Sequence, residues 1–404
     1  MTSSFGSFMN HNHFAGYAEL GAMLSLGLCL DRVRREGEVS GRALLWAGAA
    51  GLTGLAHLAS QSRGGLLGLG AGLATFALLR WAGPLSLRRA ALAVAAAAAI
   101  LAASFAVLPA SARERVLAAA TDGSASYRLH LSAATLRLAA AHPLLGAGLG
   151  AFEDAVTAFR RGDGDVRATH AENDVLEFTA ETGLLGLAAL AFGIWRLGAT
   201  GGRSPRSSAL GAGAVAAAVA LGVHSLCDFN LRVPATALAL AVCLAVASPA
   251  RPGSVSPGWL RAAIPAVLAA LGLAAATASV ASVLEVRARP LADPVARVAA
   301  LTRALSWNPL ATETRRDRAR ALVQAATGGL REARLARAAE DYRRVLEGRP
   351  RWAEAWYELA WVELARGDRV AARRAVEKAG ELDPVSVPLA RAREALMLRL
   401  RQPS

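Results

Sequence analysis

The stretch AALAVAAAAAILAASFAVLP, residues 90–109, contains no charged side chain and no recurring polar position. A helix that crosses the hydrocarbon core of a membrane needs about 20 consecutive apolar residues, and this stretch is long enough. An alanine-rich surface helix of a soluble protein would instead keep a polar stripe toward water. The stretch therefore predicts a membrane-spanning helix and argues against a soluble helical protein.

Similar apolar runs recur over the first two thirds of the chain. The predicted spans are 14–30, 43–60, 65–82, 90–109, 174–195, 209–226, 234–249 and 260–283. Several of them mix Gly and Ala with Leu, and such small residues allow membrane helices to pack closely. The predicted fold class is all-α: a polytopic transmembrane helix bundle of about 8 spans, followed by a soluble helical domain.

The composition agrees with a membrane protein. The 404 residues are 54% hydrophobic, and the net charge of +14 comes almost entirely from arginines, many of them in short loops between apolar runs. This distribution is typical of membrane proteins and argues against nucleic-acid binding. Cys29, Cys227 and Cys243 lie in or beside apolar runs without the spacing of a metal site, so we expect packed thiols.

Arginine-rich loops follow every second predicted span. Their arginines are Arg32, Arg34, Arg35, Arg42, Arg80, Arg88, Arg89, Arg196, Arg203, Arg206, Arg251 and Arg261. Such loops face the cytoplasm, so the other loops, including a long one at about 110–173, are expected outside. Both chain ends then lie outside. Because the first residues form neither a signal peptide nor a basic flank, we expect further spans upstream, so that the chain is N-terminally incomplete.

The chain changes character after residue 284. Residues 285–404 are rich in Arg, Glu and Ala, and Pro350 and Pro384 lie 34 residues apart, the period of tetratricopeptide repeats. Glu363 occupies a position that usually holds Tyr in that pattern. We predict a transmembrane domain over 1–284 and a tetratricopeptide-like domain over 285–404 that binds a protein partner. A plain helical hairpin cap is the alternative.

Polar motifs gather at the outer ends of the spans. The segment TDGSASYRLHLSAATLRLAAAHP, 121–143, predicts a helix that begins at a Ser cap, carries Arg128 in its first turn and ends before Pro143. The glycines of HPLLGAGLGAF, 142–152, follow no strand and lack the Walker lysine, so a nucleotide loop is excluded.

Five motifs occur in the order typical of one family. They are NHNHFAGY at 10–17, SRGG at 62–65, HPLLGAGLGAF at 142–152, HAENDVLEF at 170–178 with ETGLLGL behind it, and HSLCDFNLRVPA at 224–235. The chain resembles the O-antigen ligase and polymerase family of membrane glycosyltransferases over roughly residues 8–240, and more closely those members with C-terminal tetratricopeptide repeats. Each motif is weak alone, but five in order on one predicted face form a specific signal.

The resemblance implies transfer of a glycan from undecaprenyl diphosphate to an acceptor hydroxyl at the periplasmic face of the bacterial inner membrane. Arg63 and Arg128 match the family's two motif arginines, which would hold the diphosphate, since the guanidinium fork grips phosphate oxygens. The alternative is that Arg63 only extends its charged end to the membrane–water interface. His170 matches the family's loop histidine and would act as general base. No cofactor and no metal are expected.

Further polar residues are second-tier candidates for substrate binding. They are Glu172, Asn173, Asp174, His11, His13, His224 and Asp228. Glu172 differs from the residue that the family's motif usually has at this position. It would either support His170 or be a solvated loop acid. Asn173 and Asp174 fit helix capping equally well. Two acids inside the following span, Glu177 and Glu181, are expected to face a cavity or a partner, and one of them to meet an arginine.

Two other functions remain open at this point. One is a non-catalytic, membrane-anchored scaffold for cell-surface polysaccharide assembly, and the other is a transporter of lipid-linked glycans. A transporter would place its charges near the bilayer midplane in paired repeats, whereas the candidate residues cluster at one face, which favours an enzyme. The acceptor, whether glycan, lipid or protein, is not decided by the sequence.

Overall fold

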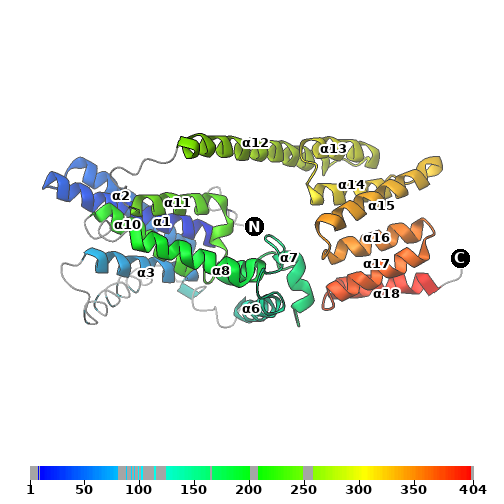
Figure 1. Ribbon diagram of the computed structural model, residues 1–404, viewed down its shortest axis with the longest axis horizontal. Helices are drawn as coiled ribbons and strands as arrows, with labels where there is room; N and C mark the ends of the chain where they lie inside the picture. Colours follow the sequence, from blue (N-terminus) through cyan, green and yellow to red (C-terminus); the bar gives the residue numbers. More distant parts are fainter. Residues whose placement is uncertain are drawn as a thin grey trace. The chain divides into compact units, whose positions relative to one another are not determined.

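The computed structural model is all-α, as predicted (Figure 1). It describes residues 8, 10–80, 88, 92, 95, 99, 102, 113–114, 124–163, 166–200, 208–248 and 258–401. No strand occurs among these residues. The span predicted at 90–109 lies outside them except for isolated positions.

The chain divides into two compact units. The first comprises Met1–Phe152 and Ala168–Arg251, and the second comprises Glu153–Arg167 and Pro252–Ser404. Residues Glu153–Arg167, which we call the strap, therefore leave the first unit and belong to the second, although they lie in the middle of the long loop predicted at 110–173.

The first unit is a helical bundle. Its helices are α1 (His11–Glu36), α2 (Gly41–Ser60), α3 (Arg63–Arg80), α6 (Ser124–Ala141), α8 (Asp174–Thr200), α10 (Ala209–His224) and α11 (Pro234–Ala247), with a short 3-10 helix, η3 (Asn230–Arg232). Helix α10 is the inner one, and α1, α3 and α11 all pack against it. Their shared core includes Leu20, Met23 and Leu221.

Four of the described helices are long and apolar enough to cross a membrane. They are α1, α2, Asp174–Arg196 of α8 and Pro265–Ala288 of α12 (Gly258–Ala288). Helices α10 and α11 are apolar but only 16 and 14 residues long, and α3 covers most of the span predicted at 65–82. The number of eight spans stays a prediction.

Glycines allow the inner helix to be approached closely, as expected from the small residues of the spans. A Cβ atom on Gly213 of α10 would lie 2.6 Å from the carbonyl oxygen of Met23 and 3.0 Å from Cα of Gly27, both in α1. On the α3 side, a Cβ on Gly68 would lie 2.6 Å from the carbonyl oxygen of Ala220. Backbone therefore packs on backbone at the centre of the bundle.

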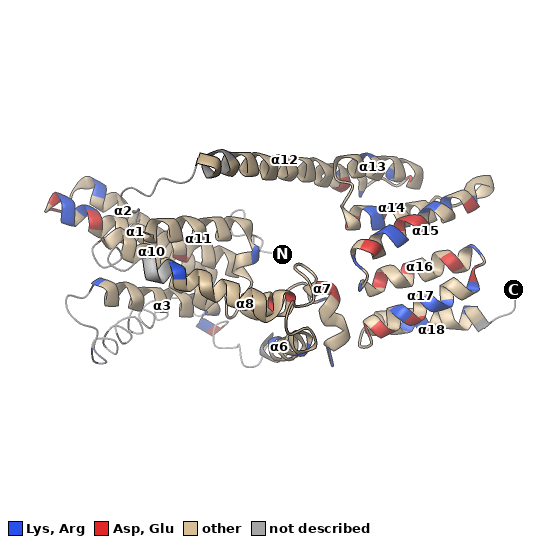
Figure 2. Cartoon of the chain, viewed as in Figure 1, with Lys and Arg blue, Asp and Glu red and all other residues tan. Residues whose placement is uncertain are grey.

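The second unit is also built of successive helices. They are α12, α13 (Pro294–Trp307), α14 (Thr312–Gln324), α15 (Arg331–Gly348), α16 (Ala353–Ala365), α17 (Arg369–Leu382) and α18 (Val387–Arg401), with 3-10 helix η4 (Gly328–Leu330). The strap contributes η2 (Val156–Phe159) and most of α7 (Phe152–Ala155). Helices α13–α18, here called the C-terminal domain, carry many charges, whereas the helices of the first unit are mostly uncharged (Figure 2).

Small buried residues let the C-terminal helices nest. Ala338, Ala360 and Ala372 are completely buried at the contacts between successive helices. Glu363, which departs from the tetratricopeptide pattern, is buried but accepts from Arg343 at 2.6 Å and from Arg366 at 3.0 Å. The charge that replaces the usual Tyr is thus compensated. The tetratricopeptide assignment itself stays a prediction.

Gly213→Ala is expected to destabilise the first unit by about 1–3 kcal/mol, because the new methyl group overpacks a backbone contact. The measurement is the Tm of the detergent-solubilised protein. Gly51→Ala is the matched control, since a Cβ on Gly51 of α2 meets no atom within 4 Å; there, helix propensity favours Ala by about 1 kcal/mol. Equal Tm values for the two variants would contradict the close packing.

Candidate functional site

The turn between α10 and α11, residues 225–232, brings together motifs that are far apart in the sequence. Asp228 lies in this turn, and its Oδ1 is 3.4 Å from Nε2 of His13 in α1. The carbonyl oxygen of Cys227 accepts a hydrogen bond of 3.1 Å from Nη1 of Arg128 in α6. The backbone N–H of Asp174, at the start of α8, donates to the carbonyl of Ser225 at 2.9 Å.

His170 lies against this turn and is oriented by a buried carboxylate. Its ring stacks on Phe229, with centroids 4.1 Å apart and planes inclined by 21°. Its Nδ1 lies 3.0 Å from Oε1 of Glu177, whose other oxygen accepts the N–H of Ala171 at 2.8 Å. Partial burial disfavours a charged ring, but the hydrogen bond and charge of Glu177 outweigh it, so the pKa of His170 is raised. The acid that supports His170 directly is therefore Glu177.

Glu172 has a different partner. Its Oε2 accepts a hydrogen bond of 3.1 Å from Nη2 of Arg128, so the acid that departs from the family's wording is paired with an arginine. Burial raises the pKa of Glu172, and the nearby Arg128 opposes that shift. Helix α6 begins at Ser124, so Arg128 is its fifth residue. The prediction that Arg128 lies in the first turn is wrong by one position, because the helix begins earlier than that prediction required.

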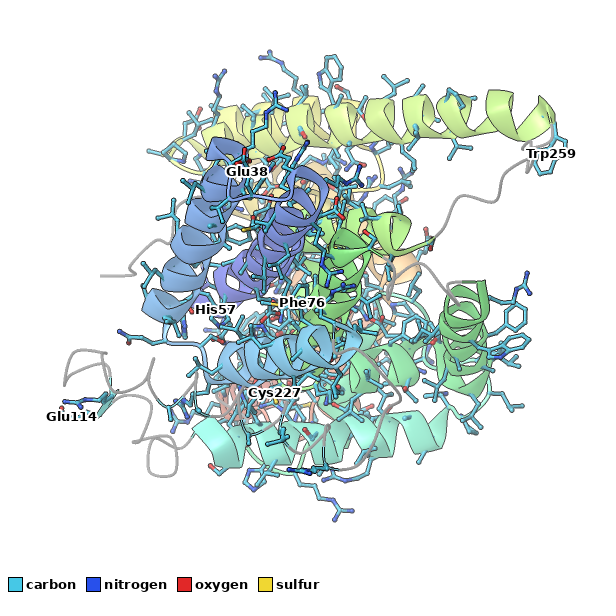
Figure 3. The ribbon with its side chains drawn as sticks, turned by 90° about the vertical axis from the view of Figure 1, so that its left-hand side faces the viewer. Glu38, His57, Phe76, Glu114, Cys227 and Trp259 are labelled. Atoms are coloured by element: carbon cyan, nitrogen blue, oxygen red, sulfur yellow. The ribbon has the colours of Figure 1, made fainter. Side chains whose placement is uncertain are left out.

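Arg63 is the first residue of α3 and is exposed. The start of this helix also packs against the turn and the residue before it. Oγ of Ser62 lies 3.3 Å from Nε2 of His224, and a Cβ on Gly64 would lie 3.3 Å from Cβ of Cys227. Figure 3 shows Cys227 beside the ribbon of α3. All three residues predicted to be catalytic thus come from segments that contact one stretch of chain, residues 224–232.

The second-tier histidines mainly join helices. His224 is completely buried, and its Nδ1 lies 3.2 Å from Oε1 of Glu19 in α1. Nδ1 of His11 lies 2.9 Å from the carbonyl oxygen of Ser60, which ties the start of α1 to the end of α2. His13 also contacts the ring of Phe229 edge-on, with centroids 4.4 Å apart.

Asp228 stays ionised because of these neighbours. Burial alone would raise its pKa, but the hydrogen bonds from His13 and from the N–H of Phe229 lower the pKa of Asp228 below its ordinary value. The turn therefore presents a fixed negative charge to His13.

Asn173 and Asp174 fasten α8 to the turn. Oδ1 of Asn173 accepts the N–H of Leu176 at 3.0 Å, which is an N-cap contact, and its Nδ2 donates to the carbonyl of Leu226 at 2.8 Å. Oδ2 of Asp174 accepts the N–H of Leu231 at 2.9 Å. Asn173 thus caps α8, and both residues bind the turn. A role of this pair in substrate binding stays a prediction.

Arg232 is a site residue that the sequence analysis did not select. Its Nη2 lies 2.6 Å from Oε2 of Glu181, and its Nε lies 3.5 Å from Oε1 of Glu177. The expectation that one of these two acids meets an arginine is confirmed, and both of them do. The only signal in the sequence was the position of Arg232 within the motif HSLCDFNLRVPA.

The glycine-rich segment after α6 forms hydrogen bonds with the backbone at a break in α8. Gly183 has φ 65° and ψ −164°, which interrupts the helix. The N–H of Ala147 donates to the carbonyl of Ala180, and the N–H of Leu184 donates to the carbonyl of Pro143, both at 2.8 Å. Gly146 has φ 70°, and a Cβ there would lie 2.1 Å from the carbonyl carbon of Glu181. The segment therefore packs on the backbone next to Glu181.

Among the residues that the structure describes, no three His, Cys, Asp or Glu side chains are arranged to hold a metal ion. Metal independence stays a prediction.

Gly183→Ala is expected to destabilise the first unit more than Gly150→Ala does. Both glycines have positive φ, 65° and 76°, where a Cβ costs about 1–2 kcal/mol. Only at Gly183 would the methyl group also collide with backbone, 2.4 Å from the carbonyl oxygen of Leu144, whereas Gly150 has no atom within 4 Å. The measurement is the Tm of each variant in detergent. Equal losses of Tm would show that the close packing at the kink does not stabilise the first unit.

Residues 48–191 match a family model described as O-antigen ligase. Among curated proteins, no relative matches the chain. The matched range includes Arg63, Arg128 and His170 but ends before the turn at 225–232. The match supports the O-antigen ligase family and, in general terms, a membrane protein that takes part in glycan transfer of the ligase or polymerase type.

Proposed function

We propose that the chain transfers a glycan from undecaprenyl diphosphate to an acceptor hydroxyl at the periplasmic face of the bacterial inner membrane. The observation that carries this proposal is the His170–Glu177 pair at 3.0 Å, held against the same turn as Arg128. A histidine paired with a carboxylate is suited to remove a hydroxyl proton, and it lies within the range that matches the O-antigen ligase model.

His170 acts as the general base. Its Nδ1 faces Glu177 at 3.0 Å, so this hydrogen bond assigns the proton of the neutral ring to Nδ1 and leaves the lone pair on Nε2. Nε2 accepts the proton of the acceptor hydroxyl as that oxygen bonds to the anomeric carbon of the glycan. Stacking on Phe229 and the contact with Glu177 fix the ring plane in advance.

Arg63 and Arg128 hold the leaving group. The bond between the anomeric carbon and the diphosphate oxygen breaks, and undecaprenyl diphosphate departs as an anion whose charge needs stabilisation. Arginine remains charged and grips phosphate oxygens in a bidentate manner. Glu172 binds Arg128 at 3.1 Å, so an arriving diphosphate would replace this carboxylate on the guanidinium.

The cellular arrangement belongs to the same proposal. Eight spans place the 61–63 turn, the loop around His170 and the 225–232 turn on the periplasmic side, because the arginine-rich loops alternate with them. The C-terminal domain, taken as tetratricopeptide-like, is then periplasmic and available to a protein partner. The reaction is proposed to need no metal, since arginines supply the positive charge.

Arg63→Ala, Arg128→Ala and His170→Ala are each expected to lower glycan transfer strongly. Loss of a general base costs about 10²–10⁴-fold, and loss of one charge-stabilising donor about 10²–10³-fold. The assay is complementation of a bacterium that lacks its own O-antigen ligase or polymerase, with product glycans separated by size and by attachment to lipid A core. His130→Ala and Arg137→Ala, in the same helix as Arg128, are the controls. Full transfer by all three site variants, at normal levels in the membrane, would refute the mechanism.

Glu177→Gln is expected to move the acidic limb of the pH–rate profile to lower pH and to reduce the rate. Only the neutral ring accepts a proton, so transfer slows as the pH falls through the pKa of His170, which Glu177 raises. Glu172→Gln is the control, because the charge of Glu172 raises the pKa of His170 less than Glu177 does and its removal should shift the limb less. If the acidic limb were unchanged in Glu177→Gln, Glu177 would not control the pKa of the base.

A further inference from the structure

The strap is connected at both ends to residues of the candidate site. Immediately before it, the N–H of Phe152 donates to Oε1 of Glu181 at 3.2 Å, and Oε2 of the same carboxylate binds Arg232. Immediately after it, Ala168 is buried and stands two residues before His170. The strap therefore continues directly into the segment that carries the proposed base.

The C-terminal domain grips the strap through one arginine. Nε and Nη2 of Arg349 bind the two carboxylate oxygens of Asp154 at 2.7 and 2.6 Å, and Nη2 also lies 3.0 Å from Oε2 of Glu153. This bidentate geometry is the strongest form of an arginine–carboxylate contact. The guanidinium also lies over the ring of Trp352, with its carbon 4.0 Å from the ring centroid, and Trp352 is almost completely buried.

The strap also contacts the C-terminal domain beyond Asp154, and its first and last residues are paired with each other. Val156 is completely buried, and Oγ1 of Thr157 donates to the carbonyl of Leu382 at 2.7 Å. The first and last residues of the strap, Glu153 and Arg167, form an ion pair of 2.7 Å. The first and last residues of the strap are thus held close together.

The C-terminal domain is itself anchored to a predicted span. Ala288, the last residue of α12, is buried with Leu301 and Ala321, and Oε2 of Glu285 accepts from Oγ1 of Thr314 at 2.6 Å. The domain that grips the strap therefore begins within a helix that is long and apolar enough to cross a membrane. The chain therefore runs from this helix directly into the domain that binds the strap.

We propose that the C-terminal domain takes part in the transfer reaction by holding the strap through the Asp154–Arg349 pair, which fixes the segment that carries His170. Arg349 is then a positioning residue for the reaction, in addition to any partner that the domain binds. The proposal rests on the proposed function, since it assigns to His170 the role of base. A displacement of about 1 Å at a reacting group costs about 10²-fold in rate, so loss of the grip is expected to be visible in transfer.

Arg349→Met tests the grip, because the methionine keeps an apolar stem over Trp352 but removes the fork. Transfer is expected to fall about 10- to 100-fold, and hydrogen–deuterium exchange of the 153–168 backbone is expected to rise. Arg344→Met is the matched control: Arg344 is in the same helix, α15, and its ion pair with Glu340, at 2.9 Å, is exposed. It should leave transfer and exchange unchanged.

Two further measurements separate positioning from a loss of folded protein. Loosening the His170–Glu177 contact should move the acidic limb of the pH–rate profile to lower pH in Arg349→Met, whereas a smaller amount of folded enzyme lowers the rate without moving the limb. Asp154→Asn combined with Arg349→Met should lose no more activity than the more impaired single variant, because both substitutions disrupt the same Asp154–Arg349 contact.

Unchanged strap exchange in Arg349→Met, or raised exchange with wild-type transfer and pH profile, would overturn the proposal. Failure of the proposed function gives a different result, namely wild-type transfer by His170→Ala. An inactive His170→Ala together with a fully active Arg349→Met would reject the grip alone.

Discussion

Two carboxylates buried at the beginning of α8 determine how the rest of the first unit is arranged. Glu177 and Glu181 are each about 1% exposed, and a buried charge is tolerated only where donors or opposite charges surround it. Glu177 is bound by His170 and by the N–H of Ala171; Glu181 is bound by Arg232 and by the N–H of Phe152. All four carboxylate oxygens have partners. Satisfying them places the His170 loop, the backbone at Phe152 and the 225–232 turn.

The same arrangement is consistent with the proposed chemical roles, since each of two residues has its own acid. Glu177 contacts His170, whereas Glu172 contacts Arg128. A base must keep an orienting partner throughout the reaction, but an arginine that receives a phosphate must be able to exchange one anion for another. The buried acid is on the histidine and the more exposed one on the arginine, with side-chain exposures of 2% and 26%. The difference in burial thus agrees with the proposed difference in task.

The sequence predicted the helical class well because its evidence was local. Apolar length and the Asn–Asp pair before α8 are readable over a few residues. Arg232 was missed because a single arginine near the end of an apolar run has the same local pattern as one that reaches to the membrane surface; only the fold shows that it faces α8. The strap was missed for a similar reason. Its charged residues are typical of a surface loop, and the arginine that binds Asp154 lies 195 residues later in the chain.

The strap also bears on how such a chain is inherited. A domain joined by one linker is exchanged by a single recombination event, and the remainder of the protein is unaffected. Here the partner surface of the C-terminal domain lies partly in Glu153–Arg167, inside the region that supplies the other unit. A chimera that replaced only the residues after 252 would leave Asp154 facing a foreign surface. Residues 153–167 and the residues after 252 are therefore expected to be inherited together, although they are distant in the gene.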